Sequence, residues 1–405
     1  MAVYLHLFLV LLSFVVFIYR YQKCSLSFFL NYNFYILFFA IFYISLPSVV
    51  SVITGHSWVS SKPSTIEYTA YIGLYFVFIF FIGYVVSPDR LNLASEVAFF
   101  RSKCFDFLVV TFFALASLYV LVVVIINIDS FFSVYGSRGL QSDLNEYLYM
   151  KYKIKPIFIA VVVFVSYIVL KNRKLYYLLA FSPFILYDVL LSARGYIYVT
   201  AVVVFLLLTF HARKVNPLYL AFTMLAIASI AVWRAIGSDF SWALIFQVFY
   251  EFIFTWSTTH IIHESTIEKD FIEAAVYGLL RFFPSFAYEV FFDKYVSYNQ
   301  IVVDNNPLGW GLAGSVVAEA LSFRSGLATF AFPFLVSFYA FTVNVFLRSK
   351  TYTGFIVFIV AVVYVRDIFR YSFLEIAMYP FYVVFFIGFL IPLLDMFNRT
   401  RRFER

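Results

Sequence analysis

The sequence predicts an all-α integral membrane protein with about eleven transmembrane helices and a large external loop that carries helices of its own. Three observations predict this fold class. Of the 405 residues, 64% are apolar and only 13% are charged, about half the ~25% charged share typical of soluble domains. Apolar runs long enough to cross a bilayer recur along the chain. Basic residues lie between these runs at every second connection, so the net charge of +7 indicates membrane topology rather than nucleic-acid binding.

A spanning helix needs about 20 mostly apolar residues. Eleven stretches are predicted as spans, with centres within residues 2–19, 33–54, 69–87, 107–128, 156–170, 175–192, 196–210, 216–235, 325–347, 352–365 and 377–396. The first is expected to be a retained helix, because no basic segment precedes it and no small-residue cleavage site comes after it.

The short loops sort by charge. Sixteen of the 29 basic residues lie in alternate connections and in the tail: Arg20, Lys23, Arg90, Arg101, Lys103, Lys171, Arg173, Lys174, Arg213, Lys214, Arg348, Lys350, Arg399, Arg401, Arg402 and Arg405. The positive-inside rule places these connections in the cytoplasm, with the N-terminus outside. Residues 241–258 are apolar enough to span and would reverse the orientation of all later spans, but Gln247 and Glu251 favour an interfacial helix, because an unpaired carboxylate at mid-bilayer is costly.

The chain is therefore expected to consist of three consecutive blocks. Residues 1–234 hold eight spans, residues 235–324 form a large periplasmic loop with interfacial helices, and residues 325–405 hold three spans and a basic cytoplasmic tail. A loop of about 90 residues is far longer than a connection requires, and long structured loops often carry function. We therefore expect any chemistry to face outward.

Five arginines fall on the predicted outer side: Arg138, Arg194, Arg281, Arg366 and Arg370. Guanidinium binds phosphate through two parallel hydrogen bonds, so such a cluster suits an anionic lipid headgroup such as a pyrophosphate. The alternative is structural. Arg366 and Arg370 lie at the C-terminal end of a span, where the helix dipole favours cations, and Arg194 lies six residues after Asp188, which could pair with it.

Glu319 lies in a glycine-loosened turn followed by a small-residue helix, PLGWGLAGSVVAEALSF (307–323). Apolar neighbours raise the pKa of a carboxyl group, which suits a general base that accepts a hydroxyl proton near neutral pH. The alternative is a structural ion pair between Glu319 and Arg324 or Arg281. Gly309, Gly311 and Gly314 spell G-x-G-x-x-G, but no strand precedes them, so a dinucleotide site is excluded.

His260 and His263 are three residues apart and share a helix face, which resembles half of a metal site. No third ligand has suitable spacing, so we expect no metal and no other cofactor. One of the two could act as an acid or base or contact the substrate, although a hydrogen-bonded interfacial histidine is the more common role.

These features together resemble the Wzy-type polymerases of bacterial O-antigen and capsular repeat units. The resemblance rests on the many spans, on the S-x-R-G turn Ser192 to Gly195, and on the external loop that reads YGLLRFFPS (277–285) and then GWGLAGSVVAEALSF (309–323). The family often has Asn-Phe-Gly after the acidic residue, where this chain has Ser322-Phe323-Arg324-Ser325-Gly326.

The resemblance implies a metal-independent, inverting glycosyltransferase with a GT-C-like architecture. It would join undecaprenyl-pyrophosphate-linked repeat units, as donor and acceptor, at the periplasmic face of the bacterial inner membrane, with a chain-length regulator as a further partner. Glu319 would be the base, Arg194 and Arg281 would stabilise the departing pyrophosphate, and the other arginines and the two histidines would bind substrate.

Two other functions remain open from the sequence. A flippase of lipid-linked oligosaccharide predicts repeated halves and polar residues near the bilayer midplane, whereas the ionisable residues here gather at the outer face. An O-antigen ligase shares the architecture of the polymerase and is poorly separated from it by sequence.

Overall fold

The computed structural model describes residues 1–55, 61–88, 103–134, 138–191, 195–212, 243–265, 268–280, 298–304, 314–349 and 351–385. Within these residues the chain is helical and forms no strand, which confirms the all-α fold class. Seven helices are long and apolar enough to cross a membrane: Ala2–Cys24, Tyr32–Thr54, Pro63–Val86, Phe105–Ile126, Ile154–Asn172, Gly326–Arg348 and Tyr352–Arg370.

These seven coincide with seven of the eleven predicted spans. Three others correspond to shorter apolar helices, at Leu175–Leu190, Gly195–Phe210 and Phe373–Phe385. The predicted span at 216–235 lies outside the described residues. A helix of 16 residues is about 24 Å long, which is less than the ~30 Å hydrocarbon core of a bilayer. The described residues thus hold seven candidate full-length spans, which supports a multi-pass membrane protein.

The chain divides into two compact units, each assembled from separate stretches of the sequence. The first contains residues 1–92, 249–349 and 360–385, and the second contains residues 93–248, 350–359 and 386–405. Helix α18 (Tyr352–Arg370) therefore contributes to both units.

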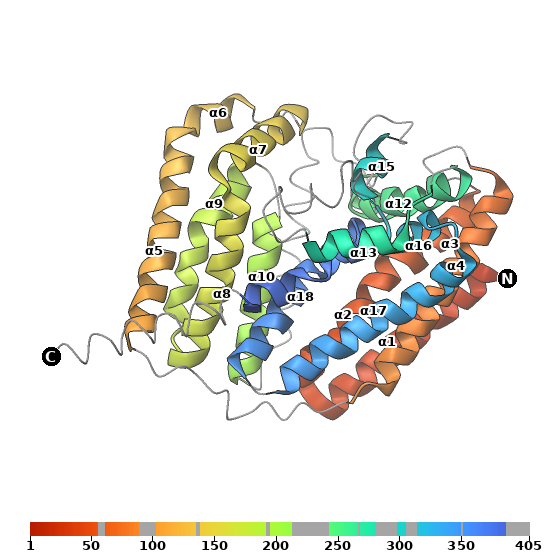
Figure 1. Ribbon diagram of the computed structural model, residues 1–405, viewed down its shortest axis with the longest axis horizontal. Coiled ribbons are helices and arrows are strands. Elements are labelled where there is room, and N and C mark those ends of the chain that lie inside the picture. The colour runs from red at the N-terminus through yellow and green to blue at the C-terminus, as the bar shows by residue number, and fades with distance from the viewer. Residues whose placement is uncertain are drawn as a thin grey trace. The chain divides into compact units, whose positions relative to one another are not determined.

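The first unit begins with α1 (Ala2–Cys24), η1 (Ser25–Leu30), α2 (Tyr32–Ala40), η2 (Ile41–Ser45), α3 (Leu46–Thr54) and α4 (Pro63–Val86). Its later elements are α12 (Ala243–Glu264, from Phe249 onward), α13 (Phe271–Leu280), α15 (Tyr298–Asp304), α16 (Val316–Ser322), α17 (Gly326–Arg348), the end of α18, and α19 (Phe373–Ile376). Helix α17 packs against both α2 and α4 (Figure 1).

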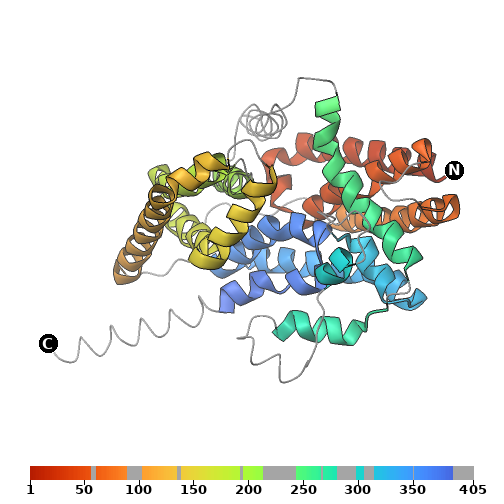
Figure 2. The same cartoon turned by 90° about the horizontal axis from the view of Figure 1, so that it is seen from above.

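Helix α12 runs across the first helices of this unit (Figure 2). Its Phe252 ring packs edge-on against Tyr43 of η2, and Gly73 of α4 leaves room for its Trp256 side chain. The π-helical turn η2 ends at Ser45, two residues before Pro47. Because proline has no N–H, it cannot satisfy the carbonyl four residues earlier, and the helix departs locally from the α-helical pattern.

The second unit comprises α5 (Lys103–Ile126), α6 (Ile128–Ser133), α7 (Arg138–Tyr152), α8 (Ile154–Asn172), η3 (Leu175–Phe181), α9 (Ser182–Leu190) and α10 (Gly195–Ala212). Helix α8 packs against α5 and α10. A salt bridge of 2.6 Å joins Lys171 at the end of α8 to Asp106 at the start of α5. It brings together two helix ends that the charge pattern places on the same side of the membrane.

Helix ends in the first unit are grouped in the same way. At one end, Arg20 of α1 donates to the carbonyl oxygens of Val85 and Ser87, and Asn31 contacts Asn344 of α17. At the other end, the Lys62 amide donates to Glu264. These contacts agree with the alternation expected from the sequence, while the periplasmic placement of the second group stays a prediction.

Candidate functional site

The strongest concentration of buried charge in the described residues lies around Glu319 of α16. The Ser315 hydroxyl caps this helix by accepting a hydrogen bond from the Val317 amide, and Glu319 lies in the first turn. The residue is 1% exposed, and it is surrounded by apolar neighbours on the same helix, as the sequence predicts. The carboxyl group is therefore ordered and removed from solvent.

The oxygens of Glu319 accept three hydrogen bonds from the segment that joins α18 to α19. The Ser372 hydroxyl donates at 2.5 Å, the Phe373 amide at 2.6 Å and the Leu374 amide at 3.3 Å. The carboxylate thus occupies the N-terminus of α19, where free amide groups favour negative charge. These partners come from a segment that is far from Glu319 in the sequence.

Two more ionisable side chains complete what we call the Glu319 cluster: Glu319, Lys269 and Glu375. The ammonium of Lys269 lies 3.7 Å from Glu375 Oε1, and both side chains are at most 5% exposed. Glu375 also accepts a hydrogen bond of 2.9 Å from the Tyr298 amide. With all three groups ionised, the cluster carries a net charge of −1 inside the protein.

The electrostatics of the Glu319 cluster result from its burial. Burial raises the pKa of the Glu319 carboxyl to about 7, although Ser372, the nearby Lys269 charge and the Phe373 amide oppose the shift. Burial also lowers the pKa of Lys269, against the attraction of Glu375 and Glu319. A carboxyl group with a pKa near 7 can exchange a proton at neutral pH, which is the property required of a general base.

Two glycines allow the backbone of 371–375 to be held this closely. A Cβ atom at Gly278 of α13 would collide with the Leu374 carbonyl, and one at Gly314 would collide with the Tyr371 carbonyl and the Tyr298 ring. Gly314 is the last glycine of the G-x-G-x-x-G pattern, and its role here is close approach of two backbones.

The arginines predicted from the sequence fall in different parts of the chain. Arg366 and Arg370 lie in the last turns of α18, so Arg370 is two residues from Ser372 and close in sequence to the Glu319 cluster. Arg138 is the first residue of α7, in the second unit. Arg194 and Arg281 lie outside the described residues.

The sequence left two structural ion pairs open, Asp188 with Arg194 and Glu319 with Arg324. The structure shows contacts of Asp188 and of Arg324. Asp188 accepts hydrogen bonds from the amides of Tyr196 and Ile197, so it caps the first turn of α10. Arg324 donates to the Ile262 and His263 carbonyls at the end of α12, while the hydrogen bonds found at the Glu319 carboxylate come from residues 372–374.

The two histidines of α12 differ in environment. His260 is fully buried against Trp256, its ring nitrogens have no hydrogen-bond partner within the described residues, and burial lowers its pKa to about 4. His263 is partly exposed and stacks on Tyr68 at 4.6 Å between ring centroids. In the described part of the chain, no three His, Cys, Asp or Glu residues are grouped to hold a metal ion.

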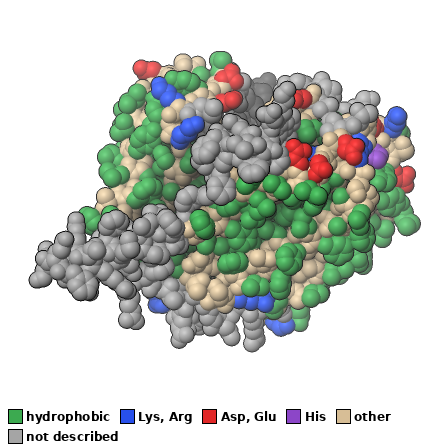
Figure 3. Space-filling model, in the orientation of Figure 1, with side chains coloured by type: hydrophobic (Ala, Val, Ile, Leu, Met, Phe, Trp, Pro, Cys, Tyr) green, Lys and Arg blue, Asp and Glu red, His purple; other side chains and the backbone are tan. Residues whose placement is uncertain are grey.

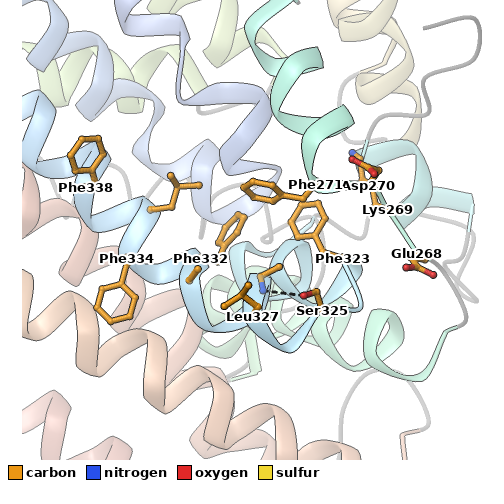
Figure 4. Close-up of a pocket in the computed structure, with 13 residues that line it drawn as sticks. Glu268, Lys269, Asp270, Phe271, Phe323, Ser325, Leu327, Phe332, Phe334 and Phe338 are labelled. Carbon is orange, nitrogen blue, oxygen red and sulfur yellow. Dashed lines mark hydrogen bonds between the residues drawn. The ribbon is translucent and has the colours of Figure 1, made fainter.

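A cavity of about 770 Å³ lies beside the cluster along α17, within the 300–1,000 Å³ range of ligand sites. Figure 4 shows its two ends. Phe334 and Phe338 line one end, and the segment Glu268–Asp270 lines the other. Acidic side chains gather beside a hydrophobic face in Figure 3. We call the 770 Å³ cavity the α17 cavity. Lys269 belongs both to its lining and to the Glu319 cluster.

Sequence reasoning missed Lys269, Ser372 and Glu375. One signal was available: Ser372-Phe373-Leu374-Glu375 has the S-x-x-E pattern of a capping box, and the Glu375 amide does donate to the Ser372 hydroxyl. The Glu375 side chain, however, turns to Lys269 and the Tyr298 amide, which no local pattern predicts.

Comparison of the chain with protein-family models, with characterised proteins and with solved structures gives no match.

Proposed function

We propose that this protein is a membrane glycosyltransferase that polymerises oligosaccharide repeat units linked to undecaprenyl pyrophosphate, at the periplasmic face of a bacterial inner membrane. The observation that carries the proposal is the Glu319 cluster. Buried ionisable groups are expensive in a membrane protein and generally mark function, and a carboxyl group with a pKa of about 7 suits proton transfer at neutral pH.

In the proposed reaction, a hydroxyl of the acceptor sugar attacks the anomeric carbon of the donor chain from the face opposite the lipid pyrophosphate. The new carbon–oxygen bond forms as the bond to the pyrophosphate oxygen breaks, so the configuration inverts. The hydroxyl proton passes to the Glu319 carboxylate. The pyrophosphate leaves with the bonding electron pair, and Arg194 and Arg281, helped by Arg138 or by the Arg366 and Arg370 pair, stabilise its charge.

The position of Glu319 adds a requirement to this mechanism. Ser372, Phe373 and Leu374 cover the carboxylate, so an acceptor hydroxyl reaches it only when segment 371–375 moves away. Such a movement exchanges three hydrogen bonds within the protein for hydrogen bonds to substrate or water. Proton acceptance would thereby be tied to substrate entry, and an idle site would stay closed to water.

The first test is a strain in which this gene is deleted. A lipopolysaccharide or capsule ladder reduced to one repeat unit on the core supports the polymerase. Unmodified core would indicate a lost flippase or ligase instead and would contradict the proposal.

The second test is Glu319→Gln in purified protein supplied with lipid-linked repeats. Glutamine retains the shape but cannot accept the proton, and its NH2 group replaces a carboxylate oxygen that accepts from segment 372–374, so we expect turnover per folded molecule to fall roughly 10²–10⁴-fold. Glu67→Gln is the matched control, because Glu67 is an exposed carboxylate of α4 in the same unit. Wild-type turnover in Glu319→Gln would exclude Glu319 as the base.

A further inference from the structure

The α17 cavity has the dimensions and position of a site for one hydrocarbon chain. Its lining residues on α17 run from Leu327 to Phe338, which is about 17 Å along the helix axis and close to half of the ~30 Å hydrocarbon core. Helix α17 is a candidate span, and its Leu327 and Phe338 are 77% and 66% exposed. The cavity therefore opens on a surface that faces lipid in a membrane, over the depth of one leaflet.

The polar end of the α17 cavity presents negative charge. Glu268 and Asp270 are exposed, whereas the charge of Lys269 between them is turned inward to Glu375 at 3.7 Å. One oxygen of Asp270 accepts the Glu273 amide and caps α13, and Glu268 and Asp270 both line this end of the cavity. A phosphate group alone would be repelled here, and a hydrogen-bond-donating cation would be attracted.

We propose that the α17 cavity binds a phospholipid with a primary ammonium head group, of the phosphatidylethanolamine class. One acyl chain lies along α17 against Phe334 and Phe338, and the ammonium donates hydrogen bonds to Glu268 and Asp270. The lipid phosphate lies towards the N-terminus of α17 near Ser325, where the helix dipole favours negative charge. This inference is independent of the proposed function.

A bound lipid at this place would also support the Glu319 cluster. Lys269 forms the cavity wall on one side and contacts Glu375 on the other, so a lipid that fills the cavity would exclude water from the side chain whose charge balances the two carboxylates. The occupied cavity would keep the cluster dry, and the pKa of Glu319 would stay raised by burial.

The experiment is native mass spectrometry of the full-length protein exchanged into phosphatidylethanolamine, phosphatidylcholine or phosphatidylglycerol of identical chains. We expect phosphatidylethanolamine to be retained about fivefold more than phosphatidylglycerol, a preference of the size that two partly exposed charge pairs provide. Glu268→Gln combined with Asp270→Asn removes both carboxylates and should therefore abolish the preference. The fold should be retained, because asparagine can still cap α13.

A second experiment tests the location of the lipid by filling the α17 cavity with a larger side chain. Ala331 lines the cavity, and Ala331→Trp should reduce retention of all three lipids, whereas Ala114→Trp on the exposed face of α5 should not. Equal or better retention of phosphatidylglycerol would overturn the head-group assignment, and normal retention in Ala331→Trp would overturn the location. Displacement of phosphatidylethanolamine by an equal concentration of undecaprenyl pyrophosphate would assign the cavity to a polyprenyl lipid instead.

Discussion

Two regions of the first unit hold a buried charge at a helix end, and they differ in what surrounds that charge. Arg20 of α1 donates to the Val85 and Ser87 carbonyls and the Ser87 hydroxyl just beyond α4, and its guanidinium lies 4.2 Å from the centre of the Tyr84 ring. Glu319 accepts from the hydroxyl and amides at the start of α19. In both, the backbone at a helix terminus satisfies the charge.

The two sites differ in whether the central group can titrate near neutral pH. Arginine stays protonated at all relevant pH values, and the hydrogen bonds of Arg20 go to a hydroxyl and to carbonyl groups. Glu319 shares its surroundings with Lys269 and Glu375, and its pKa is raised to about 7. The raised pKa of Glu319, beside two further titratable groups, is what makes it a candidate for chemistry.

Three experiments distinguish the role of Arg20 from that of Glu319. The largest effect is expected from Arg20→Ala. The change removes charged hydrogen bonds to buried carbonyls, and it should cost about 3 kcal/mol of stability. Unfolding of the detergent-solubilised protein in increasing dodecyl sulfate measures this. Arg348→Ala at the exposed end of α17 is the control.

Under the structural interpretation of Arg20, the folded fraction of Arg20→Ala retains wild-type turnover per molecule. A loss of turnover without a loss of stability would place Arg20 in the reaction and remove the distinction between the two charges.

A smaller effect is expected from Gly314→Ala. The added Cβ would meet the Tyr371 carbonyl and the Tyr298 ring, so segment 371–375 must shift, at a cost of roughly 1–3 kcal/mol. Gly326→Ala is matched to it, because nothing lies within 4 Å of the Cβ position there. Thermal melting of both variants tests the close approach, and equal melting temperatures would show that the segment is not held where the structure places it.

A third effect is a pH dependence of stability that is specific to Glu319. Its folded pKa of about 7 exceeds the ordinary value of 4.5, so between pH 4.5 and 7 the folded state binds more protons than the unfolded state. The contribution of this group to stability is therefore present in full below pH 4.5 and decreases as the pH rises to about 7.

Melting temperatures measured from about pH 5 to about pH 8 should show this decrease in the wild type and less of it in Glu319→Gln. Arg20→Ala should retain the wild-type slope, since arginine does not titrate in this range. A slope in Glu319→Gln equal to that of the wild type would show that Glu319 does not carry the shifted pKa.

The helical membrane architecture and the positions of the main spans can be predicted from the sequence alone. Long apolar runs and the distribution of Lys and Arg depend on local composition and on the bilayer thickness, and both can be read from the chain. The burial of Glu319 among small and apolar residues was also predictable, since those neighbours are adjacent in sequence. The predicted stretches 175–192 and 196–210 coincide with apolar helices at Leu175–Leu190 and Gly195–Phe210, but the sequence does not show that the first of them begins with the 3-10 segment η3.

Which groups meet in the candidate site depends on tertiary packing. Lys269, Glu319 and Glu375 are widely separated in the sequence, and Ser372 and the amides of α19 reach the carboxylate only because Gly278 and Gly314 allow the backbones to approach. The division into two units, with α18 contributing to both, also depends on contacts between distant helices. Apolar patterning specifies which residues leave water, whereas the partners of a buried charge depend on packing between segments that no local pattern encodes.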